Sequence, residues 1–252
     1  MKKILLSLCM FLSLCACSPK QEEVTITLAA AASLENAFEE EIIPAIEELY
    51  PNVTIEGVYD SSGKLQMQIE SGLNADIFFS AATKQMNTLV DEDYIQKDHV
   101  VNLLENKLVL IKGKGSQCDV TELSNIQNAD MIALGDSEIV PAGQYAKEAL
   151  TNLNVWDAIQ NKVSFASNVT EVLSWVESGS AQVGIVYKTD AISSDKIEII
   201  EECDSSLLQS PVIYPVASLN DNEMTKKVLD YICSQDALDV FRKYGFNVYE
   251  EN

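Results

Sequence analysis

The feature that most constrains this chain is a repeated alternation of short β-branched, apolar segments with longer amphipathic ones. "VTITLAA" (24–30), "VTIEGVY" (53–59) and "ADIFFSA" (75–81) are typical of strands. Between the first two lies "SLENAFEEEIIPAIEELY" (33–50), which has the apolar spacing of a helix. Strands separated by helices of this length predict a parallel α/β sheet with helices on both faces.

The same alternation continues to the end of the chain, with no evident internal repeat. It predicts strands at 107–113, 131–135, near 163 and at 181–187, followed by two or three more. Helices are predicted at 62–72 and 83–91, near 121, from 142, from about 154, from about 169, at 222–233 and at 237–246. With 252 residues, the chain has the length for one large domain or two lobes.

The N-terminus predicts export. Lys2 and Lys3 precede an apolar run over 4–14 that ends in "LCACSPK", which is typical of a signal peptide over 1–16. The residues before Cys17 resemble the lipobox of bacterial lipoproteins, which implies a lipidated Cys17, a short tether over 17–23 and a protein anchored outside the cytoplasm. The alternative is a plain secreted protein whose signal contains cysteines. No later stretch is apolar for long enough to span a bilayer.

Composition excludes several classes of protein. The formal charge of −22, which loss of Lys2 and Lys3 would lower by two, argues against a nucleic-acid partner. Beyond Cys17 the cysteines are Cys118, Cys203 and Cys233, so at most one disulfide is expected among them. The single histidine, His99, is expected in a polar surface turn, and the mature chain has no CxxC motif, so we expect no zinc site and no cofactor.

Four predicted turns between a strand and the next helix carry small or polar residues. They are "AAAAS" (29–33), "DSSG" (60–63), "VPAG" (140–143) and "ASNV" (166–169). Ligands of open α/β sheets bind at this end of the strands, and the free N–H groups of a helix start suit an anion. Proline at the first helical position followed by two small residues leaves these N–H groups uncovered. The alternative is four ordinary helix starts, with serine as the N-cap.

Several longer segments resemble the substrate-binding proteins of ABC-type molybdate and tungstate importers. They are "LAAAASLENAF", "SSGKLQMQIESGLNADIFFSA", "GDSEIVPAGQYAKEAL", "GIVYKTDA" and "FRKYGF". The resemblance implies a type II periplasmic-binding-protein fold with two α/β lobes, one over 24–103 and 212–252 and the other over 106–207. Crossings are implied near 103–106 and 207–212. It also implies a monomer that delivers its anion to a membrane permease.

Carried over residue by residue, the resemblance implies five contacts to the oxyanion. Ser33 and Ser62 would donate from one lobe, and Ala142, Val169 and Tyr187 from the other. All five are neutral donors, and the metal would be bound only through its oxygens. Without the resemblance, Tyr187 is equally an aromatic residue that closes a strand end.

Two residues depart from the family's pattern. Asp60 stands where the family has a small uncharged residue, and its carboxylate would repel a dianion if it faced the site. Alternation along the strand predicts that it points away from Ser61 and misses the site. Lys64 either adds a positive charge near the ligand or, as we expect, is a solvated helix residue.

Other functions remain open from the sequence. Ser61-x-x-Lys64 has the spacing of acyl-serine enzymes, although the S-D-N and K-T-G motifs of those enzymes do not occur in the chain. A protein of the same fold could also bind sulfate, phosphate or an organic anion. Phosphate at neutral pH usually keeps a proton that needs an acceptor, so a site made only of donors favours molybdate, tungstate or sulfate.

Overall fold

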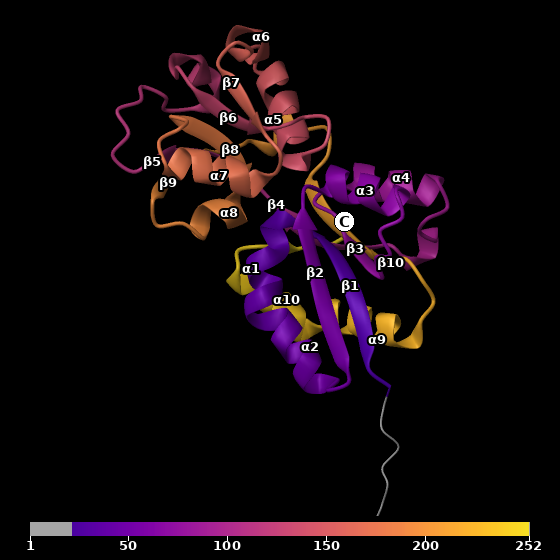
Figure 1. Ribbon diagram of the computed structural model, residues 1–252. Helices are drawn as coiled ribbons and strands as arrows, with labels where there is room; N and C mark the ends of the chain where they lie inside the picture. Colours follow the sequence, from indigo (N-terminus) through magenta and orange to yellow (C-terminus); the bar gives the residue numbers. More distant parts are fainter. Residues whose placement is uncertain (1–21, 252) are drawn as a thin grey trace, which may run out of the picture.

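A computed structural model describes residues 22–251. The predicted signal peptide, Cys17 and most of the tether lie outside the described residues. The chain forms two α/β lobes, each built on its own sheet, and β4 leads from one to the other (Figure 1). No helix within 22–251 combines the length and the apolar character needed to cross a bilayer.

The first sheet has six strands in the order β11-β4-β10-β3-β1-β2. Their bounds are β1 Val24–Ala31, β2 Val53–Asp60, β3 Ile77–Phe79, β4 Val101–Asn106, β10 Val212–Ser218 and β11 Asn247–Val248. β1 is parallel to β2 and β3. β10 is antiparallel to both of its neighbours, β3 and β4.

The second sheet has five strands in the order β7-β6-β8-β5-β9. Their bounds are β5 Leu108–Gly113, β6 Ile132–Gly135, β7 Val163–Ala166, β8 Val183–Tyr187 and β9 Ile197–Glu202. β5 is antiparallel to β8 and β9, whereas β6 is parallel to β7 and β8. The chain enters this sheet at Lys107 and returns to the first sheet between β9 and β10.

The purely parallel sheet predicted from the alternation is therefore wrong in one respect, because each sheet is mixed. Parallel neighbours need a crossover, usually a helix, between them. β5 and β10 enter their sheets directly from the other lobe, so no crossover within the sheet sets their direction. β4 and the short helix α8 (Lys188–Ile192) were also not predicted.

The remaining predicted helices are present, with ends that differ by a few residues. Their bounds are α1 Glu35–Ala37, α2 Ile43–Leu49, α3 Ser62–Glu70, α4 Thr83–Asp91, α5 Pro141–Asn152, α6 Trp156–Ile159, α7 Val169–Glu177, α9 Glu223–Ile232 and α10 Gln235–Lys243. The short helix predicted near 121 is a 3₁₀ segment over Leu123–Asn128. α1 and α2 belong to one continuous helical stretch that starts as a 3₁₀ turn at Ala32–Leu34. This stretch widens to a π-turn over Phe38–Ile42 just before Pro44. Proline lacks an N–H and its ring crowds the preceding turn, which the wider π-turn accommodates.

Alternating residues of the first sheet bury both of its faces. Ala29, Phe78 and Ala217 pack with Leu65 of α3 and Met86 of α4.

On the other face, Phe79 meets Phe38 and Phe241 in edge-to-face contacts. The aromatic contacts continue through Phe246 to Tyr214, and from Tyr214 to Tyr187 of the second lobe. A rigid aromatic core therefore reaches from the first sheet to the interface between the lobes.

Candidate functional site

Strand register brings the four polar turns together. Ala31 at the end of β1 pairs with Asp60 at the end of β2, so the turns that carry Ser33 and Ser62 lie side by side. In the other lobe Gly135 pairs with Ala166, which places the start of α5 beside the start of α7. The carboxyl ends of β1 and β2 in one lobe and of β6 and β7 in the other thus face one interface between the lobes.

All five residues carried over from the resemblance line one narrow cavity at this interface. The lining residues are Ala31, Ala32, Ser33, Asp60, Ser61, Ser62, Ala81, Val140, Pro141, Ala142, Val169 and Tyr187. The volume open to the centre of a water-sized sphere is about 10 Å³, which holds one water-sized group. A tetrahedral oxyanion would therefore enter only when the lobes part.

Several helices begin at the cavity. Ser62 is the first residue of α3, Ala142 the second of α5 and Val169 the first of α7. The first N–H groups of a helix have no partner within it, and the helix dipole places positive partial charge there. No lysine, arginine or histidine is among the described residues that line the cavity. An anion here would meet neutral donors.

The hydroxyl groups are arranged to donate. The Oγ of Ser62 is fully buried and accepts a hydrogen bond from the N–H of Ala81 at 2.9 Å, which leaves the serine's own proton free. The hydroxyl of Tyr187 lies 3.5 Å from the carbonyl oxygen of Ala81, at the limit of a hydrogen bond. Burial, followed by nearby charges, raises the pKa of Tyr187 well above its ordinary value, so the side chain stays a phenol.

Ala142 and Gly143, the two small residues of "PAG", have different structural roles. The Cα of Gly143 faces the backbone of Gly135, and a Cβ there would lie 2.1 Å from the Gly135 carbonyl oxygen. Gly143 is therefore required by the close approach of α5 to β6. Only Ala142 of the two small residues lines the cavity.

Asp60 also lines the cavity, so the prediction that it misses the site is wrong. As the last residue of β2, it lies where the chain turns, and its Oδ1 accepts from the N–H of Ser61 at 2.7 Å. Alternation therefore does not keep Asp60 and Ser61 on opposite sides, since both line the cavity. Lys64, expected to be solvated, lies 3.3 Å from the same oxygen, and Asn168 of the other lobe donates to it at 3.4 Å. The one charged group of the lining is thus paired with a cation.

Ser61, which belongs to the "DSSG" turn and is the candidate nucleophile of the enzyme alternative, shares the cavity lining. Its Oγ is buried and has no hydrogen-bond partner among the described residues. Lys64 pairs with Asp60 and not with this oxygen, so the arrangement lacks the activating lysine of an acyl-serine enzyme. Adjacent serines cannot be ranked as ligand contacts from sequence, because both suit the helix start.

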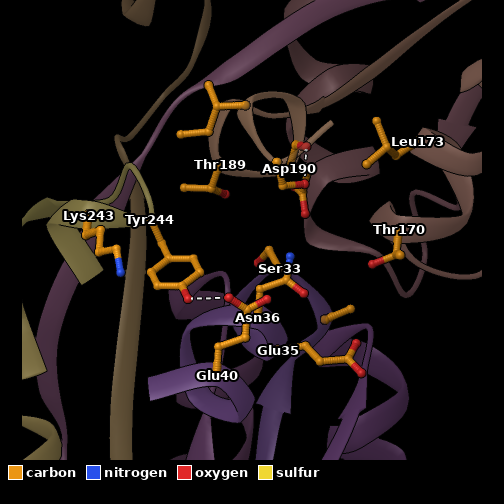
Figure 2. A pocket seen from close by; sticks show the side chains of 13 residues that line it. Ser33, Glu35, Asn36, Glu40, Thr170, Leu173, Thr189, Asp190, Lys243 and Tyr244 are labelled. Atoms are coloured by element: carbon orange, nitrogen blue, oxygen red, sulfur yellow. Dashed lines mark hydrogen bonds between the residues drawn. The ribbon is translucent and has the colours of Figure 1, made fainter. Parts of the chain in front are cut away.

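A larger cavity of about 330 Å³ adjoins the first and shares Ala32 and Ser33 with it. Figure 2 shows its side chains: the hydroxyl of Tyr244 donates a hydrogen bond to the carboxylate of Glu40, and Asp190 lies above Ser33. Burial raises the pKa of Asp190 to about 7, although backbone hydrogen bonds oppose the shift, and its Oδ2 has no hydrogen-bond partner within residues 22–251. Among the described residues of this lining, three carboxyl groups, those of Glu35, Glu40 and Asp190, outnumber the one cation, Lys243, so the cavity suits an anion less well than the first cavity does.

The sequence matches the family described as bacterial extracellular solute-binding protein over residues 26–247. The chain belongs to this family. It is 36% identical to the molybdate-binding protein ModA of Escherichia coli over 235 residues, which are 90% of each chain. It is 41% identical to YvgL of Bacillus subtilis, provisionally named an ABC transporter substrate-binding lipoprotein, over 245 residues and 94% of each chain.

The two-lobed fold of this solute-binding protein is that of known periplasmic binding proteins. The periplasmic molybdate-binding protein of Azotobacter vinelandii superposes with a TM-score of 0.77, covering 89% of this chain and all of that one. At 18% identity this likeness concerns the fold alone. The protein is thus an extracellular solute-binding protein and not an enzyme, and the acyl-serine alternative is excluded.

Proposed function

We propose that this solute-binding protein captures molybdate or tungstate between its lobes and delivers the anion to an ABC importer. The observation that carries the proposal is the convergence of helix N-termini and hydroxyl donors on a cavity in which no lining residue that the structure describes is a cation. The proposed contacts are Ser33 and Ser62 from one lobe and Ala142, Val169 and Tyr187 from the other. The name and 36% identity of the Escherichia coli relative support the choice of anion.

Closure of the lobes is part of the proposal. The donors come from both lobes, 24–103 with 212–252 and 106–207, so binding would draw the lobes together about the two crossings. In the closed, water-poor cavity, helix dipoles are weakly screened, and neutral donors suffice for a dianion.

Calorimetry against molybdate, tungstate, sulfate and phosphate tests the choice of anion. We expect tight binding of molybdate and tungstate and weaker binding of sulfate and hydrogen phosphate, since phosphate's proton needs an acceptor, the five proposed contacts are all donors, and the carboxylate of Asp60 is paired with Lys64. Affinity should change little between 0.1 M and 1 M salt, over which the Debye length falls from about 10 to 3 Å. Preference for phosphate, or a steep loss of affinity with salt, would contradict the proposal.

We also propose that Cys17 carries the lipid that anchors the protein. The sequence before Cys17 and the name of the Bacillus subtilis relative support this. Two acyl chains on one cysteine give stable attachment. Replacing Cys17 with serine should release the protein from the membrane fraction, and a wild-type protein found entirely in the soluble exported fraction would contradict the proposal.

A further inference from the structure

A chain of three polar side chains runs from the crossing between the lobes to the cavity. Asn106, the last residue of β4, places its Nδ2 3.2 Å from the hydroxyl of Tyr214 on β10. That hydroxyl lies 2.9 Å from the Oγ of Ser33. Asn106 and Tyr214 are 4% and 0% exposed, so water does not compete for these bonds.

The orientation of the Asn106 amide is fixed by its other partners. Its Oδ1 accepts from the N–H of Lys107 at 2.8 Å, and its Nδ2 donates to Thr189 of the second lobe at 2.9 Å. A flipped amide would place its NH₂ group against the N–H of Lys107. The nitrogen therefore faces Tyr214, and because an amide nitrogen only donates, the Tyr214 oxygen accepts.

The direction of the remaining bond follows. Tyr214 is a fully buried phenol that keeps its proton, because burial raises its pKa well above the ordinary value. Among the described residues, the Oγ of Ser33 is the one acceptor within hydrogen-bond distance of this phenol, since the other partner, the Nδ2 of Asn106, only donates. A buried hydroxyl proton is costly to leave unpaired, so the phenol donates it to Ser33. Ser33 then has its own proton left, and Ser33 lines the cavity. The opposite direction would turn serine lone pairs toward the bound anion.

We propose that Asn106 and Tyr214 are positioning residues that hold the Ser33 hydroxyl as a donor toward the oxyanion. This inference rests on the proposed function, in which Ser33 contacts the anion. This series of hydrogen bonds starts at Asn106, beside Lys107, where the polypeptide crosses between the lobes, and Asn106 also donates to Thr189 of the second lobe. The donor direction is therefore set at the crossing.

The test is a double-mutant cycle measured by calorimetry with molybdate. Tyr214→Phe, Ser33→Ala and the double variant are compared with wild type. We expect Ser33→Ala to weaken binding about ten- to a hundredfold and Tyr214→Phe about tenfold. In the Ser33→Ala background, Tyr214→Phe should change affinity less than twofold, because its effect passes through Ser33. Tyr94→Phe is the control, because it removes a phenol hydroxyl whose hydrogen bond, to the backbone carbonyl oxygen of Glu70, is exposed.

Each outcome separates the inference from the proposed function. Wild type that binds neither molybdate nor tungstate overturns both. Normal binding by Tyr214→Phe, with weakened binding by Ser33→Ala, overturns only the inference. Equal losses from Tyr214→Phe in both backgrounds also overturn it, since that is the signature of a purely structural role. If Tyr214→Phe does not fold, the cycle is repeated with Asn106→Ala in the wild-type and Ser33→Ala backgrounds. We expect Asn106→Ala to lower molybdate affinity only where Ser33 is present.

Discussion

The backbone N–H of Gly63 donates to the carbonyl oxygen of Ile139 across the interface between the lobes, at 3.0 Å. Gly63 follows Ser62 in the first turn of α3, and Ile139 precedes the start of α5. A Cβ on Gly63 would lie 2.3 Å from that oxygen and 2.7 Å from the Ile139 Cα. The two lobes approach this closely only because residue 63 has no side chain.

Gly63→Ala should therefore keep the lobes apart. Alanine favours a helix by up to about 1 kcal/mol over glycine, so the first lobe itself should fold at least as well. We expect a tenfold or greater loss of molybdate affinity and little compaction by small-angle scattering when ligand is added. Gln68→Ala, an exposed site on the same helix, is the control. Wild-type affinity and compaction in Gly63→Ala would show that this contact does not limit closure.

Ser62→Ala should weaken both binding and folding. The variant loses a proposed donor to the anion, and it also leaves the buried N–H of Ala81 without its acceptor. An unpaired buried N–H costs about 1 to 3 kcal/mol, which lowers Tm by roughly 2–4 °C per kcal/mol in a protein of this size. Thermal unfolding measures this, with Ser71→Ala, an exposed serine just after α3, as the control. An unchanged Tm would mean that another group replaces the Ser62 acceptor.

Lys64→Ala should weaken oxyanion binding by exposing the anion to the charge of Asp60. At this partly buried site the effect is on the order of 1 kcal/mol, or about fivefold. The loss should be larger at low salt, and Asp60→Asn in the same background should restore affinity. Lys84→Ala, on the exposed side of α4, is the control. If Lys64→Ala weakens binding equally whether residue 60 is charged or neutral, Lys64 acts on the anion directly.

Asp190→Asn should stabilise the protein at neutral and alkaline pH. The folded pKa of about 7 lies above the ordinary 3.8, so the folded state holds a proton that the unfolded state releases. The free energy of unfolding therefore falls as pH rises from about 4 to 7. The variant removes this dependence and should gain up to about 4 kcal/mol over wild type at pH 8. Denaturant unfolding at pH 5 and pH 8, with exposed Asp195→Asn as the control, checks this. An equal difference at both pH values would contradict the raised pKa.

Much of the fold was predictable from the sequence because its periodicity is strong. The strands at Val24–Ala31 and Val53–Asp60 and the helix at Thr83–Asp91 lie where the patterns place them. Strand directions were not predictable. The chain enters β5 and β10 from the other lobe, so no crossover helix within the sheet determines the direction of these strands. β4 was missed because "VNLLEN" lacks clear alternation and is followed at once by β5.

The cavity was predictable in its small and polar turns, but its finer geometry was not. Asp60 illustrates the limit, because Asp60 and Ser61 both line the cavity although alternation would place them on opposite faces. Asn106 and Tyr214 gave no signal, since Asn106 is one of several polar residues in β4 and Tyr214 lies within the mostly apolar β10. Their proximity to Ser33 depends on contacts between segments far apart in sequence.

Anomalous scattering from a molybdate complex tests whether a molybdenum oxyanion is held between the two lobes by neutral donors. A crystal of the protein with molybdate, measured on both sides of the molybdenum absorption edge, locates the metal without reference to the protein. We predict a single strong peak in the cavity, surrounded by Ser33, Ser62, Ala142, Val169 and Tyr187. A peak in the neighbouring acidic cavity, or beside Lys64 and away from these residues, would contradict the account.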